Sequence, residues 1–160
     1  MPKRRDIRRL AMQVLYQLDL GSKPERDALL ADLDEYDPPE VRAAATDLAL
    51  AAWPDREVAD SYSRQLAPDW PPHRQPAVDR AILRLAHYEM TSGHAPTKVV
   101  INEAVELAKR FSGEHSPAFI NGVLDKLARQ LREEGRLHEP EPAERPASEQ
   151  DWLRDAVEEE

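Results

Sequence analysis

Cationic side chains are concentrated at the start of the chain, and an aromatic ring follows them at helical spacing. At about 100° per residue, Arg5, Arg8, Arg9, Met12 and Tyr16 fall on one side of a helix, opposite an apolar side. Guanidinium groups bind phosphate oxygens, and a tyrosine ring stacks on an unpaired base. The pattern therefore indicates a surface for single-stranded nucleic acid. A solvated basic face, with Tyr16 at the edge of the core, explains the same residues equally well.

Side chains that would perform catalysis do not form a recognisable group in this sequence. The histidines show no His-x-x-x-His or His-Glu-x-x-His spacing: His73, His87, His94, His115 and His138. There is no glycine-rich phosphate loop and no Gly-x-Ser-x-Gly turn for a nucleophile. The chain has no cysteine, which excludes disulfides and thiolate metal sites. The sequence therefore predicts a protein that is not an enzyme and that holds no metal and no cofactor.

Charge is distributed unevenly along the 160 residues, whose net charge is −9. Residues 1–10 carry five basic and one acidic side chain, a net of +4, whereas residues 133–160 carry eleven acidic and three basic ones, a net of −8. This separation predicts a basic binding arm and an acidic tail. No apolar run approaches the roughly 20 residues that cross a bilayer. Because the lack of cysteine also fits a reducing compartment, we expect a cytoplasmic protein.

Apolar residues recur every three or four positions along most of the chain, which predicts helices without strands. The first helix is expected over residues 3–20. Later helices are expected over 24–36, 39–53, 58–66, 76–92 and, as a final pair, within 96–132. We expect an all-α protein of two small bundles with about three helices each. The folded domain should cover residues 1–134, with subdomains of about 1–68 and 73–134.

The final pair of helices contains a polar break and an unusual dipeptide. The apolar face of its first helix is formed by Val100, Ala104, Leu107, Ala108 and Phe111. After the break at residues 112–115, Ser116 is expected to be the N-cap and Pro117 the first helical residue. Asn121-Gly122 then lies inside the second helix, where glycine costs about 1 kcal/mol relative to alanine. The dipeptide indicates either a close helix contact or backbone and amide access for a ligand.

The composition changes at residue 135. Residues 135–150 carry prolines among charged side chains and almost no large apolar side chain, so we expect residues 135–160 to be a disordered acidic tail. Near its end, the apolar residues of 152–157 are spaced for a last helical turn or two. Such a tail either only keeps the protein soluble or competes with nucleic acid for the basic arm.

Several segments resemble a known family. Residues 98–109 (Lys-Val-Val-Ile-Asn-Glu-Ala-Val-Glu-Leu-Ala-Lys) and 119–126 (Phe-Ile-Asn-Gly-Val-Leu-Asp-Lys) resemble NusB, a family of bacterial factors for processive transcription antitermination. Residues 79–89 and the arginine-rich start up to Tyr16 match the same family. The resemblance implies an all-helical fold that binds RNA.

The resemblance also implies partners and site residues. It implies binding to the boxA element of ribosomal RNA leader transcripts, as a heterodimer with the ribosomal protein NusE, in a complex with other Nus factors and RNA polymerase. The RNA-binding residues that it implies are Lys3, Arg4, Arg5, Arg8, Arg9, Gln13, Tyr16, Phe119 and Asn121. Glu89 matches a family position at or beside the NusE contact, although a surface acid in a last helical turn explains it equally well. His115 stands at another such position, where the family often has an acidic or lysine side chain.

Two other functions are compatible with these residues. One is an RNA-binding module related to the one fused to ribosomal RNA cytosine methyltransferases, although nothing after residue 134 would hold S-adenosylmethionine. The other is a helical adaptor whose basic arm contacts acidic groups of a protein. Pull-down with and without nuclease treatment separates that adaptor from an RNA binder.

Overall fold

The computed structural model describes residues 4–140, and within this range every regular element is helical. The elements are α1 (Arg4–Asp19), α2 (Arg26–Ala31), α3 (Pro39–Ala52), the 3-10 turn η1 (Trp53–Asp55), α4 (Arg56–Leu66), the 3-10 turn η2 (Pro72–Arg74), α5 (Ala77–Ser92), α6 (Thr97–Phe111) and α7 (Ser116–Glu133). The all-α prediction is confirmed. The short helix expected within 24–36 is α2, which has 6 residues.

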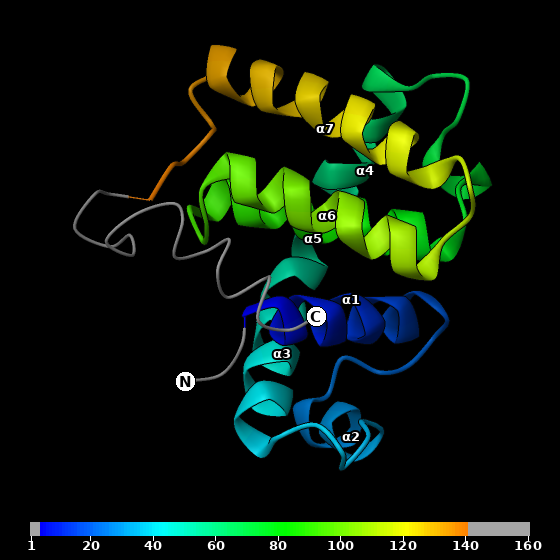
Figure 1. The fold of residues 1–160 in the computed structure, drawn as a ribbon, viewed down its shortest axis with the longest axis vertical. Helices are drawn as coiled ribbons and strands as arrows, with labels where there is room; N and C mark the ends of the chain where they lie inside the picture. Colours follow the sequence, from blue (N-terminus) through cyan, green and yellow to red (C-terminus); the bar gives the residue numbers. More distant parts are fainter. Residues whose placement is uncertain (1–3, 141–160) are drawn as a thin grey trace.

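Helix α5 is the central element of the fold. It packs against α1, α3, α4, α6 and α7, so the lower group α1–α3 and the upper group α4–α7 in Figure 1 meet along it. The sequence predicts a boundary near residue 68, but α4 packs on α5 and α7 and belongs with the C-terminal helices. The chain passes between the two groups of helices at the 3-10 turn Trp53–Asp55, which directly follows α3.

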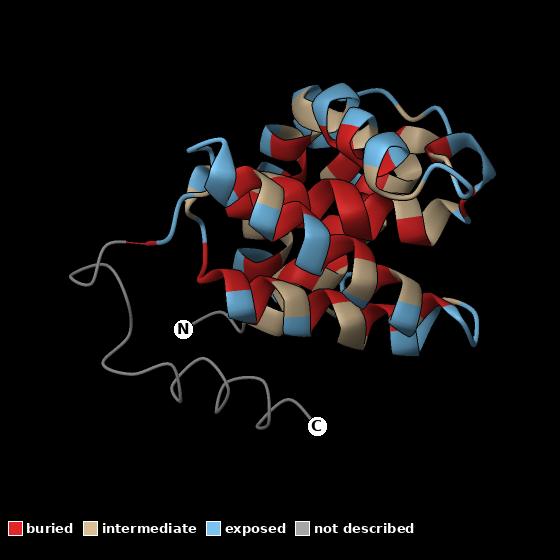
Figure 2. Cartoon of the chain, turned by 90° about the horizontal axis from the view of Figure 1, so that it is seen from above, coloured by how far each residue is buried: buried red, intermediate tan, exposed pale blue. Residues whose placement is uncertain are grey.

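One buried apolar cluster joins the two groups of helices, as the continuous buried interior of Figure 2 shows. It extends from Leu10 on α1 through Ile82 and Met90 on α5 to Leu124 and Leu131 on α7. Burying a side chain of this size contributes roughly 1.5–3 kcal/mol. Because the two groups share this cluster, we expect them to unfold together.

Two arginines of α5 link neighbouring helices on the polar side of the core. Arg80 forms an ion pair with Asp19 at the end of α1. Arg84 donates to Asp19 at 3.0 Å and to Asp60 on α4 at 2.7 Å. Burial raises the pKa of the Asp19 carboxyl, but hydrogen bonds and charge from the two guanidinium groups outweigh it, and the pKa lies below its ordinary value. This polar side of α5 is therefore an internal contact.

The turn between α6 and α7 is held by a buried carboxylate. The predicted N-cap at Ser116 is wrong, because His115 occupies that position and Ser116 is the first residue of α7. The hydroxyls of Ser112 and Ser116 donate to Asp79 at 2.5 and 2.8 Å. Asp79 is only 2% exposed. Asp79 therefore holds the turn between α6 and α7 close to the first turn of α5 by two hydrogen bonds.

Residues 135–140, here called the C-terminal strap, cross the turn between α5 and α6. The backbone N–H of His138 donates to the Met90 carbonyl at 2.9 Å, and the Glu139 carboxylate accepts from the Thr97 N–H at 3.1 Å. Helix α6 has no side-chain cap from its own N-cap residue, Pro96, so Glu139 supplies one. Disorder from residue 135 is therefore wrong for the strap. Residues 141–160, with the expected helical turn at 152–157, lie outside the described residues.

Candidate nucleic-acid interface

A shallow pocket of about 280 Å³ opens on the outer side of α1. It is lined by Arg9, Met12, Gln13 and Tyr16 of α1, by Val78 of α5 and by Phe111 of α6. The four α1 residues are spaced i, i+3, i+4 and i+7, which places them on one strip of the helix. The structure thus brings together three residues that the sequence predicts to bind RNA, namely Arg9, Gln13 and Tyr16. We call this site the α1 pocket.

Phe111 is the residue of the α1 pocket that sequence reasoning missed. The helical pattern predicts it in the core, but it is 42% exposed because α6 ends there and no further turn covers it. The Arg110 guanidinium lies 5.0 Å from the centre of its ring. An exposed ring with a cation beside it is suited to stacking on a base. The signal for it was its place at the helix end, directly before Ser112-Gly113.

Two arginines of α1, Arg9 and Arg5, form ion pairs with carboxylates of the same chain. Arg9 donates to Asp37 at 2.8 Å and to Asp6 at 3.3 Å. Burial lowers the pKa of the Arg9 guanidinium, but these two carboxylates raise it more, so the group stays charged. Arg5, one turn earlier, donates to Glu103 of α6 at 3.2 Å. Arg4 begins α1, and Lys3 lies outside the described residues.

Arg8 and Glu89 correct the helical-face prediction. The sequence places Arg8 on the polar side of α1 and Glu89 at a partner surface, but they are 4% and 2% exposed and form an ion pair at 3.0 Å. His94 lies 2.9 Å from the same carboxylate. Burial raises the pKa of Glu89, but Arg8 and His94 hold it below its ordinary value. Surface exposure of the two residues was wrongly expected because α3 and α5 both pack on α1. The part of α1 that stays exposed is therefore narrower than the polar side of an isolated helix.

The remaining predicted residues lie at the start of α7. Asn121 and His115 are exposed, and Phe119 is half-buried beside a hollow of about 410 Å³ that Trp70, Gly122 and other residues also line. Helices α5 and α6 lie between α1 and α7, so these residues do not join the α1 pocket (Figure 1). No atom lies within 4 Å of a Cβ built on Gly122. The close helix contact suggested for Asn121-Gly122 is therefore wrong, and access from outside is the alternative that the structure leaves.

Comparison with known protein families gives a match to one family model for most of the described residues. The model describes the NusB family and matches residues 5–129, which contain the whole α1 pocket and most of α7. The chain belongs to the NusB family. The transcription antitermination protein NusB of Solibacter usitatus is 41% identical to it over 136 residues, which cover 83% of this chain and 93% of that protein. The NusB resemblance of the sequence is thus confirmed, and with it a role in transcription antitermination.

Solved structures agree with the NusB assignment. T. maritima NusB is similar with a TM-score of 0.69 and 30% identity, over 81% of this chain and 94% of that one. A chain from the crystal structure of a plectonemic RNA supercoil is similar with a TM-score of 0.71 and 27% identity, over 82% of this chain and 98% of that one. The NusB relatives carry the name of a regulatory factor of transcription and not that of a catalyst.

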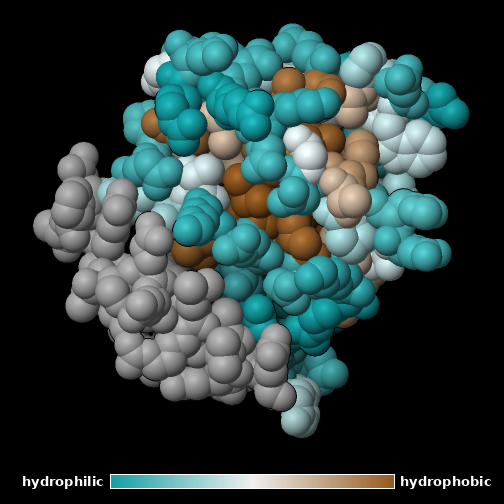
Figure 3. Space-filling view, turned by 45° about the horizontal axis from the view of Figure 1, so that its top comes forward, coloured by the Kyte–Doolittle hydropathy of each residue, from teal (hydrophilic) through white to brown (hydrophobic). Residues whose placement is uncertain are grey.

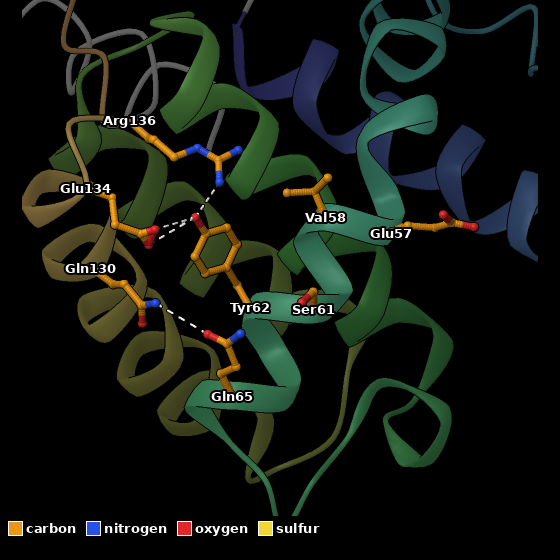
Figure 4. A pocket seen from close by; sticks show the side chains of 8 residues that line it. All are labelled: Glu57, Val58, Ser61, Tyr62, Gln65, Gln130, Glu134 and Arg136. Atoms are coloured by element: carbon orange, nitrogen blue, oxygen red, sulfur yellow. Dashed lines mark hydrogen bonds between the residues drawn. The ribbon is translucent and has the colours of Figure 1, made fainter.

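A larger cleft of about 530 Å³ lies between α4 and the end of α7 in this NusB protein (Figure 4). Tyr62 is at its base, where its hydroxyl bonds to Glu134 at 3.0 Å and accepts from Arg136 at 2.6 Å. Burial and the bond to Glu134 raise the pKa of the Tyr62 phenol. Because Glu57 and Glu134 line the cleft together with Arg136, it presents mixed polar groups and not a row of cations. It is therefore a weaker candidate for RNA than the α1 pocket.

Among residues 4–140 there is no group of three or more His, Cys, Asp or Glu side chains placed to hold a metal ion. In the same range no helix is both long and apolar enough to span a membrane. The face in Figure 3 is mainly hydrophilic, with hydrophobic side chains gathered near its centre.

Proposed function

We propose that this NusB protein binds boxA-type single-stranded RNA of ribosomal RNA leader transcripts together with the ribosomal protein NusE. It then acts in the cytoplasm with other Nus factors at RNA polymerase. The observation that supports this most strongly is the α1 pocket, where Arg9 and Gln13 lie beside the rings of Tyr16 and Phe111. Cations, an amide and rings are the groups that hold unpaired nucleotides in proteins.

Binding alone is sufficient for this role, so the residues need only hold the RNA. Lys3, Arg4, Arg5 and Arg9 would contact phosphates, which supplies the salt-dependent part of the affinity. Tyr16 and Phe111 would stack on bases, and Gln13 would hydrogen-bond to a base edge. Phe119 and Asn121 would contact a more distant part of the same strand.

The two residues assigned to NusE have different parts in this proposal. His115 is exposed at the start of α7 and stays a candidate contact. Glu89 is buried with Arg8, so it would act indirectly by holding α1 against α5. For the same reason Arg8 positions the RNA-binding helix and does not itself contact phosphate.

The test is a titration of a boxA-like strand and a scrambled strand, each with and without NusE. We expect tighter binding of the boxA-like strand when NusE is present. Tyr16→Ala should weaken that binding by roughly 1–3 kcal/mol for the lost stack, or about 5- to 150-fold. Val58→Ala is the control, because Val58 is 39% exposed and lies on α4 beside a different cleft. Equal affinities for both strands in the presence of NusE would refute the boxA assignment.

An adaptor for acidic protein groups is the second candidate. It is favoured by the contacts of Arg5 with Glu103 and of Arg9 with Asp37, which show that these guanidinium groups already bind carboxylates. Pull-down before and after nuclease treatment decides between the two. Partners that bind through RNA are lost after treatment, whereas partners of an adaptor are retained.

A further inference from the structure

The C-terminal strap determines where the rest of the acidic tail leaves the fold. His138 and Glu139 are bonded to Met90 and Thr97, on either side of the turn between α5 and α6. Pro140 is buried at the end of the strap. The described chain therefore ends beside this turn, which lies at the same end of the molecule as the start of α1 (Figure 1).

Ion pairs also indicate that the end of the C-terminal strap lies near the basic start of α1. Glu89 directly precedes Met90 and forms the buried pair with Arg8. Arg5, one turn before Arg8, pairs with Glu103 of α6, the helix whose first N–H the strap caps. The acidic tail thus begins close to the most basic segment of the chain.

The composition of residues 141–160 matches the surface beside which they begin. They carry eight acidic and two basic side chains, a net of −6. Trp152, Leu153, Ala156 and Val157 are spaced i, i+1, i+4 and i+5, which places them on one face of a helix. The α1 pocket offers the counterpart, two rings and apolar side chains next to Arg9 and Arg110.

The length of the tail is sufficient for this contact. The 11 residues between Pro140 and Trp152 reach up to about 35–40 Å when extended. Helix α1 has 16 residues and is about 24 Å long. Trp152 can therefore reach the α1 pocket from the strap.

We propose that residues 141–160 bind the outer side of α1 in the same molecule, with Trp152 in the α1 pocket and the acidic side chains beside its arginines. The tail then occupies the surface that the proposed function gives to RNA, and RNA has to displace it. The contact within one chain stands without RNA, whereas its regulatory meaning rests on the proposed function.

Disulfide trapping in the full chain tests the contact. Because the chain has no cysteine of its own, only the introduced pair can form a disulfide. One variant carries Gln13→Cys in the α1 pocket and Gln150→Cys beside Trp152. The control carries Gln130→Cys with the same Gln150→Cys, because Gln130 lies on α7 only five residues before the strap. At low salt we expect several-fold more intramolecular disulfide in the Gln13 variant than in the control. The excess should shrink at 0.5 M NaCl and on adding Trp152→Ser with Leu153→Ser.

Two outcomes overturn the proposal: equal yields in both variants, or disulfides that join two chains only. RNA affinity of the full chain then measures the regulation. If the tail covers α1 nine-tenths of the time, Trp152→Ser with Leu153→Ser should tighten RNA binding roughly tenfold at low salt. If the Gln13 variant forms the disulfide while the cysteine-free chain binds no RNA, the tail contact stands and the proposed function alone is refuted. If the cysteine-free chain binds RNA but the Gln13 variant shows no disulfide preference, the tail contact alone is refuted.

Discussion

At the scale of single residues, the buried pair of Arg8 and Glu89 differs most from its prediction. Both are charged residues on predicted polar faces, yet together they tie α1 to α5 inside the molecule. Ionised side chains are seldom fully buried unless they are paired. A helical wheel of either helix alone contains no information about the other, which is why the pair was not predicted. Their burial makes them a stability element with a definite pH dependence.

Glu89→Gln should destabilise the protein at neutral pH. Removing one charge of a buried pair leaves Arg8 uncompensated, which costs roughly 3–5 kcal/mol. The folded-state pKa of Glu89 lies below its ordinary value of 4.5, so its contribution is present above about pH 4.5 and is lost as the pH falls through the folded pKa. Urea unfolding at pH 7, 5, 4 and 3 measures this, and the difference between the two proteins should narrow below pH 4.5. Glu106→Gln, in an exposed pair with Lys109, should change the free energy of unfolding by less than about 0.5 kcal/mol.

Gly122→Ala should stabilise α7. No atom lies within 4 Å of the added Cβ, so the substitution only removes the helix penalty of glycine, about 0.5–1 kcal/mol. Thermal unfolding measures the gain, and a lower midpoint would mean that a contact at Gly122 has been overlooked. Asn121→Ala, at the exposed neighbouring position, should leave the midpoint nearly unchanged and weaken the binding of RNA or of NusE.

At the scale of elements, the helices were predictable and their neighbours were not. The spacing of apolar residues located all the long helices, because a period of 3.6 residues is visible in one sequence. The partners of α4 and the exposure of Phe111 depend on which helix ends lie together, which no local pattern contains. The C-terminal strap was missed because its stabilising contacts are mainly individual hydrogen bonds, such as those to Met90, Thr97 and Tyr62, within a composition typical of disorder. Of the candidate site, the α1 strip was predicted and its α5 and α6 walls were not.

Removing the C-terminal strap should cost more stability than its composition suggests. A chain that ends at residue 134 loses the cap on α6 and the bond to Met90. We expect it to be about 1–3 kcal/mol less stable than a chain that ends at residue 140. Glu139→Ala alone should cost about 1 kcal/mol in chemical unfolding, whereas Glu133→Ala, exposed on α7, should have no measurable effect. Equal stability of the two truncated chains would show that the strap contributes nothing.

At the scale of the whole molecule, the two ends of the chain differ most in charge, because the start is basic and the end is acidic. The net charge of −9 alone argues against nucleic acid, yet the cations are gathered at one end of α1. Ion pairs within the fold reduce the number of cations that RNA can use, because Arg8 is buried with Glu89. The effective charge of the RNA-binding surface therefore follows from the fold as well as from the composition.

The affinity for RNA should fall with salt in proportion to these cations. About four phosphate contacts to a single strand give a slope of log affinity against log salt near −3, at roughly −0.7 per contact. Arg5→Gln with Arg9→Gln should flatten the slope by about 1 to 1.5. Arg26→Gln with Arg64→Gln removes two exposed charges elsewhere and should leave the slope unchanged. If both double variants show the parental slope, α1 is not the electrostatic contact.

The α1 pocket is assembled from residues that a ribosome synthesises far apart in time. Phe111 follows Tyr16 by 95 residues, which at 5–20 residues per second is about 5–20 s of translation. Until α5 emerges, α1 lacks one of its two main packing partners, so the nascent N-terminal half should be a substrate for chaperones and proteases. Limited proteolysis of ribosome-arrested chains measures this. Chains that stop before α5 should be cleaved within α1, whereas chains long enough to expose α7 should resist cleavage there. A newly made chain would thus become able to bind RNA only when its synthesis is nearly complete.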